Sequence, residues 1–201
     1  ENNNSQEATM TKEIDVRGLA CPLPVIHTKK ALEEIDEGDV TVIIEREEGN
    51  QNVQRFAKSQ GFPVNVEKKD GLFYIHIQKT KQQKESVIKQ SGNVIFITTE
   101  CLGTGDEKLG KILMKAFLNT VWDADPKPRK IMFLNNGVHL TIEGSDVLDT
   151  LKLLEKDGVE ILSCGTCLEF YGLKEKLRVG QVTNMYDTVD SLLKADKVIK
   201  I

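Results

Sequence analysis

Hydrophobic and polar residues follow regular patterns in two parts of the chain. Residues 12–79 and 93–201 are patterned throughout, whereas residues 80–92 are mostly Lys, Gln and Ser. A polar run between two patterned regions is typical of a linker. We therefore predict a disordered leader at 1–11, a first domain at 12–79, a linker at 80–92 and a second domain at 93–201.

The first domain shows four strand-like runs and two helix-like runs. The strands are predicted at residues 13–17, 39–46, 64–68 and 72–78. The two helices fill the first two gaps and end at Gly38 and Gly61, because glycine commonly follows the last helical turn. Asp70 and Gly71 mark a tight hairpin between the last two strands. The order βαβαββ predicts an α+β two-layer sandwich with both helices on one face of the sheet.

The second domain alternates apolar strands with helical patterns. The strands are predicted at residues 94–98, 130–135, 159–163, 182–186 and 198–201. The clearest helix has its predicted buried face at Leu109, Ile112, Leu113, Ala116, Phe117, Thr120 and Val121. Ser145 is the expected cap of a second helix. Repeated β-α alternation with continuous apolar strands predicts an α/β, flavodoxin-like, doubly wound parallel sheet.

Charge and hydropathy exclude two classes of partner. The chain has 27 Lys and Arg against 31 Asp and Glu, a formal charge of −4, and its basic residues are scattered. Nucleic-acid binding requires a basic patch, so no nucleic-acid partner is expected. An apolar run of about 20 residues, which a membrane helix needs, is missing from the sequence. We expect a cytoplasmic protein without a membrane partner.

Cys21 stands in the sequence Cys-Pro-Leu-Pro, followed by a helical pattern. Proline is favoured in the first helical turn, so Pro22 and Pro24 place Cys21 at or beside the start of the helix. The N–H groups of a helix start favour a thiolate. Arg17 is either a second source of positive field or a solvated charge at a strand end. The alternative for the whole motif is a helix start without chemistry.

The carboxyl edge of the second sheet is the expected ligand-binding edge. Asn135 and Asn136 follow the second strand, and Cys164 follows the third, where we expect an accessible thiol. Residues 99–101 and 184–186 follow two other strands and are expected at the same edge. In every case an ordinary turn is the alternative explanation.

Cys167 lies three residues after Cys164, so the pair forms a C-x-x-C motif. This spacing permits a disulfide, a resolving thiol or half of a zinc site. Further zinc ligands are not evident in the sequence, and no metal or cofactor is expected. Cys101 is interpreted as a small residue in a tight loop.

Longer motifs resemble two known families. DVRGLACPLP, GDVTVII and NVQRFAKSQG in residues 12–79 resemble the TusA/SirA family of small sulfur carriers. GTGDEKLGKILMKAF, NNGVHL, SCGTCLEFYGL and VTNMYD in residues 93–201 resemble a DsrE-like domain. The fusion resembles the YedF type, which is grouped with selenium metabolism. The resemblance implies that Cys21 carries a persulfide and that Cys164 occupies the cysteine position of sulfur-relay members.

These residues lead to one functional hypothesis and two rivals. The hypothesis is a sulfur or selenium carrier, not a self-sufficient enzyme, that holds a persulfide or selenopersulfide on Cys21 and exchanges it with Cys164. The resemblance implies a cysteine desulfurase or similar donor, an unidentified acceptor protein, and a homo-oligomer formed through the DsrE-like domain. The rivals are a regulatory module that binds a small ligand or protein, and a thiol-disulfide switch between Cys164 and Cys167.

Overall fold

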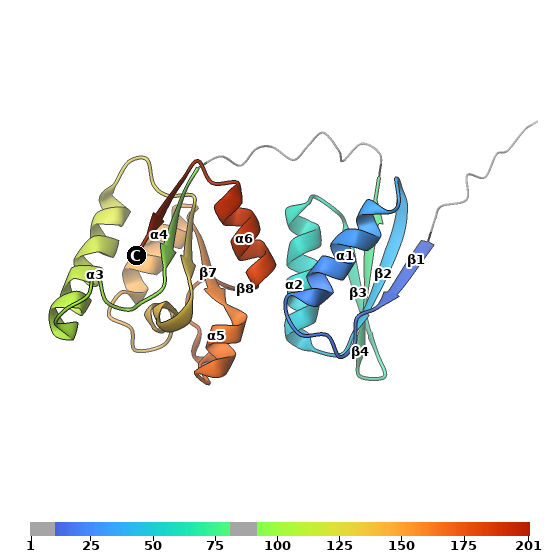
Figure 1. Ribbon diagram of the computed structural model, residues 1–201, viewed down its shortest axis with the longest axis horizontal. Helices are drawn as coiled ribbons and strands as arrows, with labels where there is room; N and C mark the ends of the chain where they lie inside the picture. Colours follow the sequence, from blue (N-terminus) through green and yellow to red (C-terminus); the bar gives the residue numbers. More distant parts are fainter. Residues whose placement is uncertain (1–10, 81–91) are drawn as a thin grey trace, which may run out of the picture. The chain divides into compact units, whose positions relative to one another are not determined.

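The computed structural model describes residues 11–80 and 92–201, which form two compact units (Figure 1). Nearly all of the expected leader and linker lie outside the described residues. No helix in the described part of the chain is long and apolar enough to cross a membrane. The cytoplasmic location stays a prediction.

The first unit is a four-stranded sheet with two helices. Its elements are β1 (Thr11–Asp15), α1 (Leu23–Glu33), β2 (Gly38–Ile44), α2 (Glu47–Ser59), β3 (Val64–Lys69) and β4 (Leu72–Lys79). The strand order is β1-β2-β4-β3, with β1 parallel to β2 and the other pairs antiparallel. Asp70 and Gly71 both have positive φ, 52° and 79°, as a tight hairpin requires. The predicted two-layer sandwich is confirmed.

The second unit is a five-stranded parallel sheet with helices on both faces. Its strands are β5 (Asn93–Ile97), β6 (Lys130–Phe133), β7 (Glu160–Cys164), β8 (Gln181–Thr183) and β9 (Lys197–Lys200). The intervening helices are α3 (Glu107–Asp123), the 3-10 helix η2 (Asn135–Thr141), α4 (Leu148–Lys156), α5 (Gly165–Phe170), the 3-10 helix η3 (Lys174–Lys176) and α6 (Met185–Leu193). The strand order is β8-β7-β6-β5-β9, and every pair is parallel. The flavodoxin-like class is confirmed.

The two faces of this sheet have different partners. One face packs against α3 and α4 and includes Ile97, Phe133 and Ile161. The other face includes Met132 and Leu162, which pack with residues from the end of α6 and just beyond it. Successive side chains in a strand point to opposite faces, so Cys164 belongs to the same face as Leu162. This register places Cys164 on the α6 side of the sheet.

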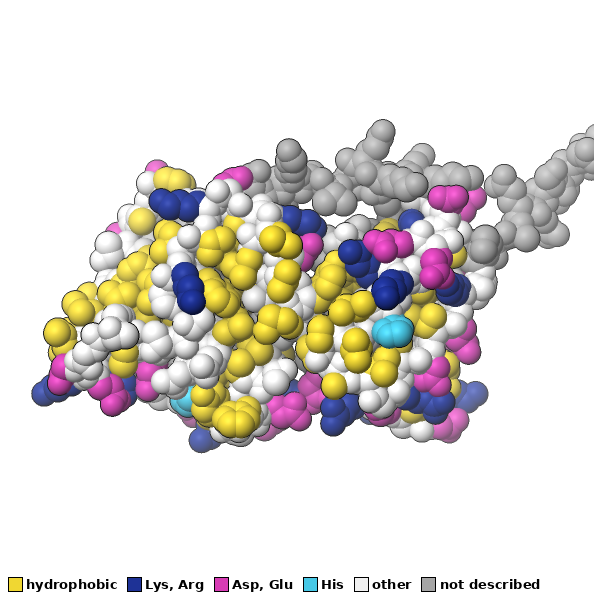
Figure 2. Space-filling model, viewed as in Figure 1, with side chains coloured by type: hydrophobic (Ala, Val, Ile, Leu, Met, Phe, Trp, Pro, Cys, Tyr) yellow, Lys and Arg dark blue, Asp and Glu magenta, His cyan; other side chains and the backbone are white. Residues whose placement is uncertain are grey.

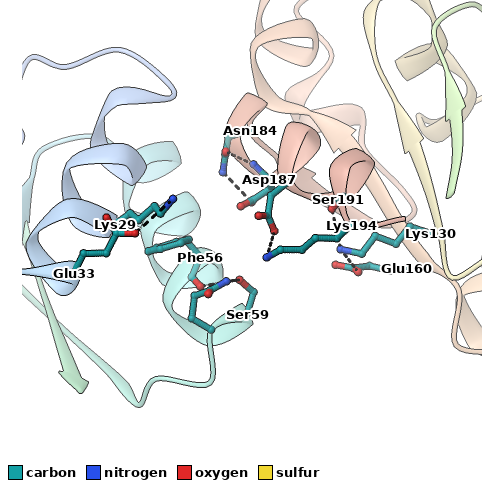
Figure 3. Close-up of polar contacts among 12 residues, drawn as sticks. Lys29, Glu33, Phe56, Ser59, Lys130, Glu160, Asn184, Asp187, Ser191 and Lys194 are labelled. Carbon is teal, nitrogen blue, oxygen red and sulfur yellow. Dashed lines mark hydrogen bonds and ion pairs between the residues drawn. The ribbon is translucent and has the colours of Figure 1, made fainter. Parts of the chain in front are cut away.

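Two predicted strands are shorter than expected. The strand predicted at 130–135 ends at Phe133 because Asn135 has a left-handed φ of 47° and begins η2. The strand predicted at 182–186 ends at Thr183 because Asn184 caps α6. The Asp187 N–H donates to Asn184 Oδ1 at 3.0 Å, as Figure 3 shows.

Helices α3 and α4 also differ from their predicted forms. The buried side of α3 is formed by Gly110, Met114, Leu118 and Val121. Most of the predicted buried face is exposed instead, and only Val121 of it is buried; the exposed positions are Leu109, Ile112, Leu113, Ala116 and Thr120. The reason is that α3 has two apolar stripes, and the pattern does not say which one meets the sheet. Helix α4 begins at Leu148, and Ser145 Oγ accepts the Val147 N–H at 3.4 Å without capping the helix itself.

Candidate functional site

Cys21 is an exposed thiol at the start of α1. The turn around it is held by the backbone, since the Leu23 N–H donates to Ala20 O at 2.9 Å. Pro22 is the N-cap residue, and Pro24 is buried in the first turn. This arrangement fixes the backbone on both sides of Cys21 and leaves its side chain at the surface.

Arg17, the proposed source of positive field near Cys21, is paired with Asp15. Its Nε donates to both carboxylate oxygens of Asp15 at 2.9 Å. This hydrogen bonding lowers the pKa of Asp15 to about 2, so the pair stays ionised over the physiological range. The guanidinium charge of Arg17 is therefore offset by the adjacent carboxylate.

Leu23 lies two residues after Cys21 and is 42% exposed. An exposed leucine alone needs no explanation. It adds apolar surface beside the exposed thiol of Cys21.

Cys164 lies at the end of β7 and is only 5% exposed. The expectation of an accessible thiol is wrong, because β7 is an interior strand and β8 pairs alongside it, with Thr183 opposite Cys164. Burial, followed by a hydrogen bond with the Cys167 thiol, raises the pKa of Cys164 to about 12. Cys164 is therefore protonated at neutral pH.

Cys167 differs from Cys164 in exposure and in its hydrogen-bond partners. It is partly exposed, and the Asn135 N–H donates to its Sγ at 3.2 Å. The hydroxyl of Tyr171 donates to Asn135 Oδ1 at 2.9 Å. The ring of His139 meets Tyr171 edge-on, with centroids 4.8 Å apart. Asn135 thus joins the cysteine pair to a small aromatic cluster.

Asn136 reaches in the other direction, toward the end of β5. Its Nδ2 donates to Glu100 Oε1 at 3.5 Å, and Glu100 lies 3.5 Å from Lys111 Nζ. The 3-10 helix η2 can approach the end of β5 this closely because residue 137 is glycine, since an added Cβ there would lie 2.6 Å from Ile97 O. Segments after β5, β6 and β7 therefore meet at the carboxyl edge of the sheet.

Two other expected residues have structural contacts. Cys101 packs against Gly110 of α3, where an added Cβ would lie 2.7 Å from the Cys101 Cβ. Its Sγ lies 3.6 Å from the backbone oxygen of Glu107. Asn184 is buried and exchanges hydrogen bonds with Asp187 at the start of α6 (Figure 3).

Sequence reasoning missed Tyr171, His139 and Thr183. An aromatic pair directly after the C-x-x-C helix was the available signal for Tyr171. Thr183 is 1% exposed, and its Oγ1 has no hydrogen-bond partner among the described residues. Its position opposite Cys164 becomes clear only from the pairing of β7 with β8.

A metal site is not formed by these residues. Across residues 11–80 and 92–201, no three His, Cys, Asp or Glu side chains lie close enough together to hold a metal ion.

Comparisons with known proteins match each unit separately. Residues 12–79 match the family model described as sulfurtransferase TusA, and residues 105–201 match the DsrE/DsrF-like family. Over 75 residues, the chain is 33% identical to the sulfur carrier protein TusA of Allochromatium vinosum, covering 36% of this chain and 99% of that protein.

Two further matches extend this picture. A crystal structure of a SirA-like protein from Desulfitobacterium hafniense has 38% sequence identity and a TM-score of 0.33, covering 34% of this chain and 96% of that one. An uncharacterized protein of Methanocaldococcus jannaschii is 27% identical over 185 residues, covering 85% of this chain and 65% of that protein. The two family models confirm the resemblance expected for each domain.

Proposed function

Because the chain belongs to the TusA family of sulfur carriers through residues 12–79, joined to a DsrE/DsrF-like unit, we propose that it is a two-domain chalcogen carrier. Cys21 holds a sulfane sulfur or selenium as a persulfide or selenopersulfide. The second unit exchanges this atom through the Cys164–Cys167 pair. The exposed position of Cys21 at the start of α1 is the observation that supports the proposal most directly.

The transfer chemistry needs an accessible sulfur atom. The thiolate of the receiving protein attacks the outer atom of the persulfide. The S–S bond breaks, and its electron pair stays on the cysteine sulfur that carried the atom. Cys21 meets the requirement of access in both directions, loading and unloading. Because both units belong to one chain, exchange between them occurs at an effective concentration on the order of millimolar.

The proposed partners follow from this chemistry. A cysteine desulfurase or a similar donor loads Cys21, and an acceptor protein, still to be identified, receives the atom. Leu23, 42% exposed beside Cys21, provides apolar contact area for either partner. The native chalcogen, sulfur or selenium, is decided by the donor.

Self-association through the second unit is part of the proposal. Leu109, Ile112 and Leu113 form an apolar stripe on α3 and are 53%, 58% and 41% exposed. Their spacing covers one side of the helix opposite its buried residues, so α3 is apolar on two sides. Figure 2 shows many hydrophobic side chains on the visible surface of the second unit.

Self-association has a direct test. We expect light scattering to give an oligomer for the full chain and a smaller species for Ile112→Asp. Leu153→Asp is the matched control, because Leu153 is an exposed apolar residue on a different helix, α4. A monomeric wild-type chain at micromolar concentration would contradict the oligomer.

The carrier function is tested by mass spectrometry. The full chain is incubated with a cysteine desulfurase and cysteine, and peptides are then mapped without reductant. We expect a gain of one sulfur atom on Cys21, its loss in Cys21→Ser, and no change in Cys101→Ser. A Cys164–Cys167 disulfide that forms equally well when the desulfurase is omitted, with no sulfur gain on Cys21 when it is present, would support the thiol-disulfide switch. An unchanged chain would support a binding module.

A further inference from the structure

The two thiols of the second unit have unequal positions. Cys167 is partly exposed. Cys164, three residues earlier at the end of β7, is only 5% exposed. We propose that Cys167 takes the sulfur atom from the carrier and that Cys164 then attacks Cys167, releasing the atom as hydrosulfide and closing a Cys164–Cys167 disulfide. This assignment rests on the proposed function for the origin of the sulfur, and it adds a reductive release step to it.

Access favours Cys167 as the acceptor. A persulfide borne by a protein can react only with a sulfur that the protein surface can approach. Phe170 and Tyr171 follow Cys167 at the end of the same short helix and are 82% and 37% exposed. These aromatic side chains offer contact area to an incoming protein near Cys167.

Two donors point at the sulfur of Cys167. The Asn135 N–H lies 3.2 Å from Sγ, and the protonated Cys164 thiol is hydrogen-bonded to the same sulfur. Hydrogen-bond donors aimed at a sulfur stabilise negative charge on it, which a nucleophilic sulfur carries before it attacks. Asn135 is in turn held by the Tyr171 hydroxyl at 2.9 Å. Cys167 therefore packs against the core while its sulfur receives a hydrogen bond from the sheet edge.

Cys164 has the position of a resolving thiol. Cys164 is the N-cap residue of α5 and Cys167 lies in the first turn of that helix, so the two thiols are neighbours, and the burial of Cys164 prevents reaction with outside persulfides. Thr183 lies opposite Cys164 in the β7–β8 pairing, and its buried hydroxyl has no partner among the described residues. An unpaired buried hydroxyl is costly, and it can donate to a negatively charged sulfur when one forms.

The two steps balance in atoms and electrons. First, the Cys167 thiolate attacks the outer sulfur of the Cys21 persulfide, which leaves a Cys167 persulfide and a Cys21 thiolate. Second, the Cys164 sulfur attacks Cys167 Sγ, forms the disulfide and expels hydrosulfide, while the Cys164 proton goes to solvent or to the leaving sulfide. The released sulfur is reduced by two electrons, and the two cysteine sulfurs supply one each. A dithiol reductant then restores the pair.

The experiment uses glutathione persulfide as the donor and the full chain with Cys21→Ser, so that the second unit is loaded directly. The reduced protein is freed of reductant, one equivalent of donor is added, and released sulfide and peptide masses are measured. We expect sulfide release together with a Cys164–Cys167 disulfide. Adding Cys164→Ser should leave a persulfide on Cys167 and slow sulfide release by about tenfold or more. Adding Cys167→Ser should prevent both.

Three controls accompany the test. Cys101→Ser in the same background should behave like its parent. Cys164→Ala removes the thiol without burying the serine hydroxyl that Cys164→Ser introduces. Near-ultraviolet circular dichroism checks that each variant remains folded. Equal sulfide release with and without Cys164, or a persulfide found on Cys164 when Cys167 is replaced, would overturn the assignment. Because Cys21 is absent from this experiment, failure of the carrier proposal and failure of this assignment give different results.

Discussion

Cys21 and Cys164 are the same residue type at the start of a helix, yet their surroundings are opposite. Cys21 precedes α1 in a surface turn, whereas Cys164 ends an interior strand and precedes α5. Its thiol is covered because β8 pairs beside it and α6 packs on the same face of the sheet. A position before a helix does not by itself make a thiol reactive, because the elements packed around the thiol decide its access to solvent.

The largest expected difference is the rate of alkylation by iodoacetamide at pH 7. Burial raises the pKa of Cys164 from 9.0 to about 12, so at pH 7 its thiol is about a thousandfold less ionised than it would be at the reference value. We expect Cys21 to react at least about a thousandfold faster than Cys164, since burial adds to the difference in ionisation. Peptide mass mapping over time measures both rates.

The matched control is the same reaction in denaturant, where all four cysteines should react at similar rates. If the native alkylation rates of Cys21 and Cys164 lie within a factor of about ten of one another, the predicted difference in reactivity is wrong. Such a result would mean that the thiol of Cys164 is open to solvent in solution.

Much of this fold follows from local patterns, and the burial of Cys164 does not. Strand and helix order could be predicted from periodicity, and the position of Cys21 from Pro22 and Pro24, because these signals act over a few residues. The contact between Asn135 and Cys167 joins residues 32 positions apart. It depends on how η2 passes over the sheet edge, which no local pattern encodes.

Helix α3 gives a second example of this limit. Its two apolar stripes, one with Leu109 and one with Met114, have similar hydrophobicity along the sequence. The core contacts of Met114, Leu118 and Val121 with the sheet show which side is buried. The exposed stripe is then available for self-association.

The pH dependence of stability should reveal the burial of Cys164. Folding raises the Cys164 pKa from 9.0 to about 12, so the folded state favours the protonated thiol. This contribution is fully present below pH 9 and is lost as the pH rises toward 12. The free energy of unfolding should therefore fall above pH 9, by at most about 1.4 kcal/mol per pH unit from this group.

Urea unfolding at pH 8 and pH 10 measures this effect in the wild type and in Cys164→Ala. Trp122, the one tryptophan of the chain, lies on α3 and reports on the second unit by fluorescence. The stability difference between the two proteins should shrink at pH 10. A stability difference that stays constant between pH 8 and pH 10 would contradict the buried thiol.

A smaller effect is expected when the support of Cys167 is weakened. Tyr171→Phe removes the hydroxyl that donates to Asn135 Oδ1 at 2.9 Å. Loss of one such hydrogen bond is worth about 0.5 to 1 kcal/mol, so sulfur transfer to Cys167 should slow by about two- to fivefold. The transfer rate from glutathione persulfide measures this, and Tyr74→Phe in the first unit serves as the control. An unchanged rate would show that Asn135 is held without Tyr171.

The smallest effect is expected at Arg17, and it tests whether the reactivity of Cys21 comes from the helix start or from this charge. Arg17 is exposed and paired with Asp15, whose pKa is lowered to about 2 by that pairing, so the two charges offset one another at neutral pH. Interactions between exposed charges are also screened by salt. Arg17→Gln should therefore change the alkylation rate of Cys21 by less than about twofold. Asp15→Asn removes only the negative partner, so it should raise that rate, and the increase should disappear at high salt. A large loss of rate in Arg17→Gln would instead make Arg17 the main electrostatic support of Cys21. The difference in alkylation rate between Cys21 and Cys164 would then come from this charge as well as from burial.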